Sequence, residues 1–260
     1  MDKVLPDLLR SKRILSTRPT QQSASWCVFL RDSGALVDNI PMLAIAPLED
    51  DESTQAIKKS ILDFDLVDKA IFVSQNAVRY GLDWLDSYWP QLPKGPRFLA
   101  IGAATARALE DCGIPCEQSG ISMNSEELLL LPGLQQLNGQ RILIFRGLGG
   151  RTLIGDTLRK RGGRVNYCEL YRRILPQEAA DSLAQYGFQP DAICVHSGET
   201  LTNLTFCIHQ TGQSTLFQTP LVCPSVRVAK LAGELGFTAC HAALNAGDSA
   251  MLEALRKAVC

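Results

Sequence analysis

Residues 13–19, RILSTRP, and residues 141–147, RILIFRG, decide the fold, because they begin two copies of one pattern. Residues 70–78, AIFVSQNAV, match residues 192–200, AICVHSGET, 122 positions later. All α/β units alternate apolar strands with helices, but four matching blocks in the same order favour an internal duplication. The two remaining pairs are FLAIGAATARAL at 98–109 with LVCPSVRVAKL at 221–231, and NSEELLLL at 124–131, an expected apolar helix, with GDSAMLEAL at 247–255.

Each copy alternates short apolar runs with helical stretches of about 10 to 15 residues, which predicts parallel sheets covered by helices on both faces. The extended segments 37–47 and 164–176 occupy equivalent places in the two copies. We therefore predict an α/β fold of two similar three-layer α/β/α domains, the second inserted in the first and joined to it by these two segments. The first domain is expected at 1–40 plus 172–260, and the second at 42–170.

The composition argues against several classes of protein. The chain has 26 Lys and Arg against 27 Asp and Glu, and a net charge of -1 predicts neither nucleic acid nor membrane as a partner. Residues 1–19 hold no apolar run long enough for a signal peptide, so we expect a cytoplasmic protein. The nine cysteines form no CxxC pair, which favours buried thiols over a metal site. The turn RGLGGR at 146–151 lacks the Lys-Ser/Thr end of a phosphate loop, which argues against a nucleotide.

Small and polar residues follow the predicted strands and precede the predicted helices. Ligands of open parallel sheets bind beyond the carboxyl ends of the strands, and helix starts offer free N–H groups and a positive dipole end to anions. Ser74, Ser197 and Ser225 are also ordinary helix N-caps, which explains each serine alone. Taken together, the turns indicate a large ligand with several acidic groups in a cleft between the domains. The predicted substrate-binding residues are Thr17, Arg18, Ser74, Gln75, Asn76, Ala103, Thr105, Arg146, Gly147, His196, Ser197, Gly198 and Ser225.

Strong acids and bases are scarce in this pattern. His196, His209 and His241 are far apart in the sequence, and no GxSxG motif indicates a serine hydrolase. Tyr167 and Tyr171 lie four residues apart on one predicted strand, so both are expected on the same face of the sheet. Tyr171 also lies where the chain returns between the domains, so its phenol is a candidate for the predicted cleft.

With these blocks assembled, the chain resembles the uroporphyrinogen-III synthase family. The resemblance implies a lyase that closes hydroxymethylbilane, a linear tetrapyrrole with eight carboxylates, to uroporphyrinogen III. The terminal hydroxyl leaves as water and ring D is inverted through a spiro intermediate, with no metal and no cofactor. The resemblance covers nearly the whole sequence and rests on ILSTRP, IFVSQNAVRYGL, FLAIGAATARALEDCGI, ILIFRGLGGRTLIGDTLRKRGGRVNYCELYRR, DAICVHSG and CPSVRVAKLAGELGF.

The resemblance also implies roles for single residues. Tyr171 matches the family's tyrosine at the end of this strand, and is the implied catalytic residue that assists departure of the hydroxyl. The serines and threonines of the other turns are implied to hold acetate and propionate groups together with backbone amides. Arg18 and Arg146 are implied to add charge-assisted contacts to these carboxylates.

The sequence departs from the family pattern in two places. Val73-Ser74 stands where relatives often carry Thr-Ser, and the run Pro-Ser-Val-Arg at 224–227 makes Ser225 a less secure ligand contact. A monomer is expected, with a transient contact with hydroxymethylbilane synthase as a further expectation. The alternative function is that of a non-catalytic two-domain cytosolic binding protein for a small anionic ligand.

Overall fold

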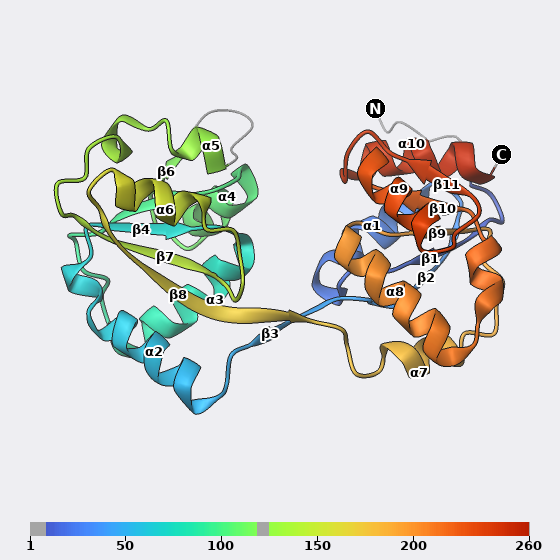
Figure 1. Cartoon of the computed structure of the whole chain (residues 1–260), viewed down its shortest axis with the longest axis horizontal. Helices are drawn as coiled ribbons and strands as arrows, with labels where there is room; N and C mark the ends of the chain where they lie inside the picture. The colour runs from blue at the N-terminus through green and yellow to red at the C-terminus, as the bar shows by residue number, and fades with distance from the viewer. Residues whose placement is uncertain (1–8, 119–124, 260) are drawn as a thin grey trace. The chain divides into compact units, whose positions relative to one another are not determined.

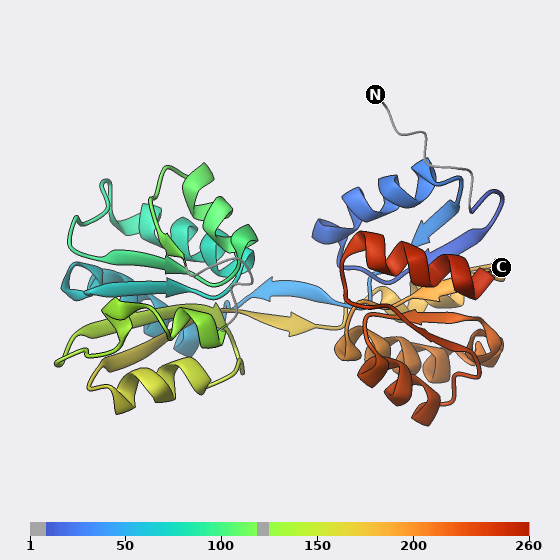
Figure 2. The same cartoon turned by 90° about the horizontal axis from the view of Figure 1, so that it is seen from above.

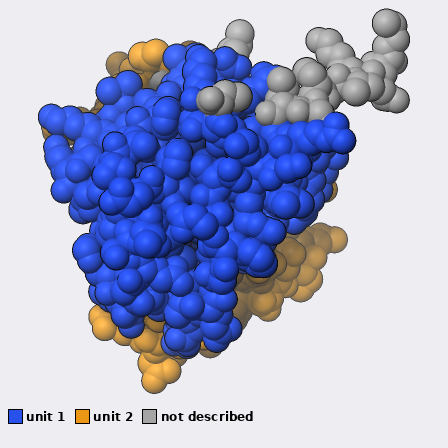
Figure 3. Space-filling view, turned by 90° about the vertical axis from the view of Figure 1, so that its right-hand side faces the viewer, with its two compact units in different colours: residues 1–44, 174–260 blue, residues 45–173 orange. Residues whose placement is uncertain are grey.

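The computed structural model of the chain describes residues 9–118 and 125–259 and divides into two compact units. Unit 1 combines Met1–Ala44 with Ile174–Cys260, and unit 2 is the continuous segment Ile45–Arg173. Figure 3 colours unit 1 blue and unit 2 orange. Within the described residues, no helix is both long and apolar enough to cross a membrane.

The sheet of unit 1 has five strands in the order β11-β10-β9-β1-β2, and each neighbouring pair is parallel. Helices cover both of its faces, with α1 and α10 on one face and α7, α8 and α9 on the other (Figure 1). Along β1, Ile14 packs in the α1 cluster and Leu15 in the α8 cluster, because both faces of the strand are buried. The elements are β1 (Arg13–Ser16), α1 (Thr20–Asp32), β2 (Leu36–Asn39), α7 (Ala179–Ala184), β9 (Ala192–Cys194), α8 (Gly198–Thr211), the 3-10 helix η3 (Ser214–Gln218), β10 (Leu221–Cys223), α9 (Val226–Glu234), β11 (Cys240–Ala242) and α10 (Asp248–Val259).

The sheet of unit 2 has six strands in the order β3-β8-β7-β4-β5-β6, and the pairs from β8 to β6 are parallel. Helices α2, α3 and α4 pack on one face, where Phe72 stacks on Phe145 at 4.5 Å between ring centroids, while α5 and α6 pack on the other. The elements are β3 (Ala44–Pro47), α2 (Asp51–Leu62), η1 (Phe64–Leu66), β4 (Lys69–Phe72), α3 (Gln75–Tyr88), β5 (Arg97–Ala100), α4 (Ala103–Asp111), β6 (Glu117–Gln118), α5 (Ser125–Leu128), η2 (Pro132–Leu134), β7 (Arg141–Gly147), α6 (Leu153–Lys160) and β8 (Arg164–Ile174).

The two sheets have the same order once the sequence repeat is applied to them. The repeat matches β1 with β7, β9 with β4 and β10 with β5, so β2-β1-β9-β10-β11 corresponds to β8-β7-β4-β5-β6, with β3 added in unit 2. Each unit therefore takes its first β-α-β from one sequence copy and its remaining strands from the other. Figure 2 shows this in unit 1, where blue N-terminal elements lie with orange and red C-terminal ones. The predicted fold class, two similar α/β domains with parallel sheets, is confirmed.

The apolar helix predicted at 124–131 is much shorter than expected. Only Ser125–Leu128 is α-helical, Asn124 lies outside the described residues, and the following leucines form a turn before η2. Pro132 disfavours a helical backbone at the residue before it, and Leu131 is accordingly extended, with ψ at 132°, so the helix cannot run through all four leucines. As a result Leu130 is 73% exposed, so the run of leucines does not form one buried helix face.

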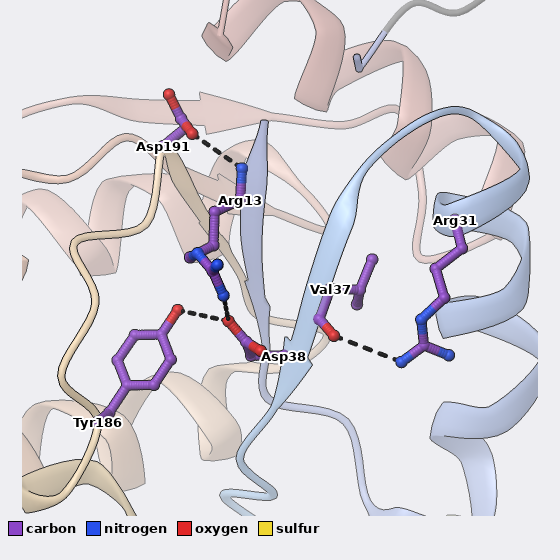
Figure 4. Close-up of polar contacts among 6 residues, drawn as sticks. All are labelled: Arg13, Arg31, Val37, Asp38, Tyr186 and Asp191. Carbon is purple, nitrogen blue, oxygen red and sulfur yellow. Dashed lines mark hydrogen bonds and ion pairs between the residues drawn. The ribbon is translucent and has the colours of Figure 1, made fainter. Parts of the chain in front are cut away.

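A polar network covers the edge strand β2 of unit 1 (Figure 4). Asp38 Oδ2 accepts hydrogen bonds from Arg13 Nη1 at 2.8 Å and from Tyr186 Oη at 2.9 Å. Arg31 donates to the carbonyl of Val37 at 3.3 Å. Charged side chains on an edge strand oppose the addition of a foreign strand. The β2 edge of this sheet therefore carries charged side chains, whereas the equivalent strand β8 in unit 2 is paired with β3.

Candidate functional site

A β-bulge near the carboxyl end of β8 determines where Tyr171 points. Strands β7 and β8 pair in regular register until Gly147, which pairs with Tyr171 and makes Leu170 the inserted residue. Bulges re-aim the side chains beyond them. Tyr167 lies before the bulge and packs in the cluster under α6, while Tyr171 lies beyond it and joins Leu170 and Cys168 in the cluster under α3. The prediction that the two tyrosines share a face is wrong, because it assumed an unbroken alternation along β8.

The Tyr171 side chain is fixed on several sides. It is 3% exposed, and its ring stacks on Tyr80 of α3 with 5.7 Å between centroids. A Cβ at Gly147 would lie 2.5 Å from Tyr171 Cε2, so a bare glycine lets the ring pass over β7. The phenol oxygen lies 2.8 Å from Ser74 Oγ. The fold therefore brings together two residues that the sequence separates by 97 positions.

Ser74 lies between β4 and α3 and caps the helix. Its backbone is extended, and its Oγ accepts the N–H of Ala77 at 3.1 Å. Gln75 and Asn76 form the first turn of α3, where Gln75 is exposed and Asn76 half-buried. The N-cap interpretation of Ser74 is thus confirmed, and the same serine also contacts Tyr171.

Arg146 holds the Gly-rich turn after β7. Its side chain is 5% exposed, and it donates from Nε to the carbonyl of Gly147 and from Nη1 to that of Arg151, both at 3.2 Å. The guanidinium lies over the Tyr167 ring, 4.6 Å from the centroid, and its Nε is 3.7 Å from Glu169 Oε1. Arg146 therefore has internal partners on several of its nitrogens before any ligand binds.

A cavity of about 450 Å³ lies at this edge of unit 2, and we call it the Tyr171 cavity. Three arginines line it together with backbone of the Gly-rich turn and the two tyrosines of β8. Such a lining combines positive charge, N–H groups and apolar walls, which suits a partly apolar anion. Ser74 contacts this cavity through Tyr171 rather than as a lining residue. The lining is Val73, Ile101, Ser125, Ile144, Arg146, Gly147, Leu148, Gly149, Gly150, Arg151, Ile154, Tyr167, Tyr171 and Arg173.

The turn after β5 is built around Gly102, whose φ is +92°. A glycine adopts this backbone without strain, and the turn leads directly into α4. Ala103 is exposed at the first position of α4, whereas Thr105 is buried and donates its backbone N–H to the carbonyl of Gly102 at 3.0 Å. The neighbouring Ile101 reaches the Tyr171 cavity, but Ala103 and Thr105 do not line it.

In unit 1, the turn after β1 is held by its own polar side chains. Thr17 is fully buried and donates from Oγ1 to the carbonyl of Cys194 at 3.0 Å. Arg18 pairs with Asp248 at 2.6 Å, and its guanidinium lies 4.9 Å from the Trp26 ring centroid. Arg18 is thus anchored on α10 and α1.

The arginines of the two units are equivalent residues of the repeat. Arg18 and Arg146 each follow or end the first strand of a copy, and each lies over an aromatic ring beside a carboxylate. The carboxylates differ in origin, since Asp248 belongs to α10 and Glu169 to the neighbouring strand β8. The duplication thus preserved a cation at the carboxyl edge of both sheets while its partners changed.

His196 follows β9 at the same edge of unit 1. Its ring meets Trp26 edge-on at 5.4 Å, and neither ring nitrogen has a hydrogen-bond partner among the described residues. Burial, helped by the charge of Arg18, lowers the pKa of His196 to about 3. The imidazole is therefore neutral at physiological pH.

Two of the predicted turns of unit 1 lead into α8 and α9. Ser197 forms a capping box with Thr200, next to Gly198, and Ser225 accepts the N–H of Val228 at 3.4 Å. Both serines therefore serve as helix caps. Among the described residues there is no group of three His, Cys, Asp or Glu side chains that could hold a metal ion.

Comparison with known proteins identifies the family to which this chain belongs. A family model described as "Uroporphyrinogen-III synthase HemD" matches residues 26–253. The chain belongs to the uroporphyrinogen-III synthase family. It is 36% identical to the uroporphyrinogen-III synthase of Escherichia coli over 94% of this chain and 99% of that protein. It is 33% identical to the enzyme of the same name from Salmonella typhimurium, with the same coverage.

Solved structures of the synthase family share the fold. A mutant uroporphyrinogen III synthase from Thermus thermophilus aligns with a TM-score of 0.61 at 18% identity, covering 96% of this chain and 99% of that one. Uroporphyrinogen-III synthetase from Helicobacter pylori aligns with a TM-score of 0.59 at 14% identity, covering 95% and 99%. At such identities the likeness concerns the fold alone.

Several residues that shape these sites were not singled out from the sequence of this synthase family member. Tyr80 supports Tyr171, while Trp26 and Asp248 hold Arg18. Asp248 lies 230 positions from Arg18, so no local pattern could link them. Glu169 offered a signal, because it lies on the same strand as the two tyrosines that had drawn attention.

Proposed function

We propose that this chain is a uroporphyrinogen-III synthase, a lyase that closes hydroxymethylbilane to uroporphyrinogen III with loss of one water. The supporting observation is the identity of 36% that extends over nearly the full length of both this chain and a curated synthase. The terminal hydroxyl leaves, the resulting cation is attacked by the substituted carbon of ring D, and fragmentation of the spiro intermediate followed by reclosure inverts that ring. Family membership argues against the non-catalytic binding protein as an alternative.

Control of geometry is the main task in this reaction. Unassisted closure of hydroxymethylbilane gives the symmetrical isomer, so the protein has to hold ring D where its substituted carbon is attacked. Correct placement of reacting atoms alone can supply several kcal/mol. The electron-rich pyrroles expel the hydroxyl with modest acid assistance, and no cofactor or metal is part of the proposal.

Tyr171 is the proposed catalytic residue. Its phenol is held rigidly by Tyr80, Gly147 and Ser74, and its side chain lines the Tyr171 cavity. In this role the O–H donates a hydrogen bond to the departing hydroxyl of the substrate. Positioned proton donors of this kind contribute roughly 10²- to 10⁴-fold to a rate.

The carboxylates of the substrate are the proposed partners of the strand-end turns. Free N–H groups at the starts of α3, α4, α8 and α9 suit acetate and propionate groups. In unit 2 the arginines of the Tyr171 cavity add positive charge, and in unit 1 Arg18 does so. The proposed substrate-binding residues are Thr17, Arg18, Ser74, Gln75, Asn76, Ala103, Thr105, Arg146, Gly147, His196, Ser197, Gly198 and Ser225.

The proposed setting is a cytoplasmic monomer that receives its substrate from hydroxymethylbilane synthase in a transient contact. The chemistry supports a short transfer, because free hydroxymethylbilane closes on its own to the wrong isomer. Size-exclusion chromatography with light scattering tests the monomer, and a dimer mass at micromolar concentration would refute it.

Product analysis tests the proposed function. Purified protein is mixed with hydroxymethylbilane, the products are oxidised to porphyrins, and the type I and type III isomers are separated. The type III isomer is expected in excess over a protein-free control. Formation of only the type I isomer at the uncatalysed rate would overturn the proposal. Tyr171→Phe is expected to fold normally and lose about 10²-fold in kcat; unchanged turnover would remove Tyr171 from the mechanism.

A further inference from the structure

The hydrogen bonds around Ser74 form a chain that begins on the backbone of α3. The N–H of Ala77 donates to Ser74 Oγ at 3.1 Å, and Ser74 Oγ lies 2.8 Å from Tyr171 Oη. Each hydroxyl has one hydrogen, so the second contact has two arrangements. Either Tyr171 donates to Ser74, or Ser74 donates to Tyr171 and leaves the phenol hydrogen for another acceptor.

The helix start favours donation by Ser74. An N–H that donates to Ser74 Oγ draws electron density from that oxygen and makes its hydrogen a better donor. The positive end of the helix dipole acts in the same direction. With Ser74 as the donor, the three groups are aligned from the backbone N–H through the serine to the phenol.

The ring of Tyr171 is already fixed, so the hydroxyl torsion is the freedom that remains. Stacking on Tyr80 and the close approach of Gly147 hold the ring plane. A phenol O–H prefers to lie in the plane of its ring, which leaves two orientations. A hydrogen bond from Ser74 occupies one side of Oη and turns the phenol hydrogen to the other.

We propose that Ser74 is a positioning residue that orients the Tyr171 hydroxyl so that its hydrogen is available to the substrate. The inference rests on the proposed function and on the catalytic role proposed there for Tyr171. It gives Ser74 a task beyond holding a carboxylate, since the serine acts through the phenol and does not itself need to touch the substrate.

Other helix caps of the chain lack this arrangement. Asp50 caps α2 by accepting the N–H of Ser53 at 2.9 Å, and Ser225 caps α9 through Val228. Ser197 shares its hydroxyl with Thr200 at 3.0 Å. Among the hydrogen bonds of the described residues, only the cap at Ser74 meets a tyrosine hydroxyl.

Steady-state kinetics with hydroxymethylbilane test the inference. Ser74→Ala is expected to lower kcat about tenfold, less than loss of a whole general acid, with a smaller rise in KM because Ser74 is also a proposed carboxylate contact. Ser74→Thr keeps the hydroxyl and the cap, and is expected to restore most of kcat. In a Tyr171→Phe background, Ser74→Ala is expected to cause no further loss, because residues that act as one unit are non-additive.

Two controls separate orientation from helix stability. Asp50→Ala removes a matched cap in the same unit and is expected to leave kcat unchanged. If Ser74→Ala fails to fold by circular dichroism, Ser74→Gly replaces it, since glycine costs a helix N-cap only a few tenths of a kcal/mol. The unfolding midpoint of each variant is measured beside its kcat and compared with that of the parent, which separates a loss of stability from a loss of turnover.

Three outcomes would overturn the inference. They are an additional loss of kcat from Ser74→Ala in the Tyr171→Phe background, a rise in KM with kcat unchanged, and a folded Ser74→Thr variant as slow as Ser74→Ala. Failure of the proposed function looks different, because the unmodified protein would then form no type III isomer. If it forms that isomer and Tyr171→Phe keeps full turnover, the function stands while the role of Tyr171 and this inference both fall.

Discussion

A methyl group at Gly147 tests the arrangement around Tyr171 most directly. In Gly147→Ala the new Cβ lies 2.5 Å from Tyr171 Cε2 and 2.9 Å from Cζ. The obstacle is a buried ring that already packs on Tyr80, rather than the mobile end of a flexible side chain. Either the ring or strand β7 has to move.

The required movement can be worked out from these distances. An ordinary contact of a Cβ begins at 3.4 Å, so the ring is about 0.9 Å too close. A shift of that size disturbs the 2.8 Å contact between Tyr171 and Ser74. Overpacking of this kind costs about 1–3 kcal/mol, and a lost hydrogen bond adds about 1 kcal/mol. We expect the free energy of unfolding to fall by about 2–4 kcal/mol and kcat to fall at least tenfold.

Urea unfolding followed by circular dichroism measures the first quantity, and turnover of hydroxymethylbilane measures the second. Gly133→Ala is the matched control in the same unit, because a Cβ there has nothing within 4 Å. It is expected to change stability by no more than about 1 kcal/mol. A Gly147→Ala protein with unchanged kcat and a free energy of unfolding within about 0.5 kcal/mol of the parent, the range of an inconsequential substitution, would refute the reasoning.

Three further predictions concern titratable groups whose ionisation the fold affects. The fold holds His196 neutral with a pKa of about 3, so unfolding takes up a proton below about pH 6.5. The free energy of unfolding therefore falls by about 1.4 kcal/mol for each pH unit between about pH 6.5 and that pKa. In urea titrations at different pH values, His196→Gln is expected to reduce this loss of stability in acid. A disulfide reagent in native buffer is expected to modify the exposed Cys112 first and Cys168 only on unfolding, because burial raises the pKa of the Cys168 thiol to about 12. Burial and the hydrogen bond to Asp38 raise the pKa of Tyr186, so the phenol is neutral in the folded protein. The free energy of unfolding therefore falls as the pH rises past about 10, where the unfolded tyrosine ionises. Tyr186→Phe is expected to cost about 1 kcal/mol at pH 7 and to remove this loss of stability at alkaline pH.

Each of these predictions has a contrary result. An acid limb that keeps its slope in His196→Gln would mean that other groups take up the proton. Labelling of Cys168 at the rate of Cys112, measured by mass spectrometry of peptides, would contradict its burial. A Tyr186→Phe protein with the parent's stability at pH 7 and the same loss above pH 10 would contradict the network at Asp38.

The fold was predictable because its signals are local and repeated. Runs such as 70–74 indicate buried strands on their own, and the second copy supports each assignment independently. The strand order of both sheets then agrees with one pattern. The four leucines from Leu128 misled the same reasoning, since the proline at 132 keeps Leu131 out of a helix whatever its hydrophobicity.

The site was predictable only in outline. Strand-end residues can be recognised in the sequence, and Ser74 and Tyr171 both stood out there without any sign of their contact. The bulge at Leu170 could not be predicted, because an inserted residue leaves the apolar pattern of β8 nearly unchanged while it moves Tyr171 to the opposite face of the sheet. The partners of Arg18 and Arg146 were also hidden, because long-range ion pairs leave no mark in sequence spacing.

The exchange of strands between the two sequence copies has a consequence for synthesis on the ribosome. Unit 2 is continuous, so its sheet can form as soon as β8 emerges. Strand β1 is different, because it lies between β2 and β9, and β9 begins at Ala192. At about 5–20 residues per second, β1 and β2 wait roughly ten seconds or more for the partner that completes their sheet. Strands β1 and β2 are therefore made before unit 2 but complete their sheet after it, and chaperone protection of a nascent chain would be needed most at these two strands.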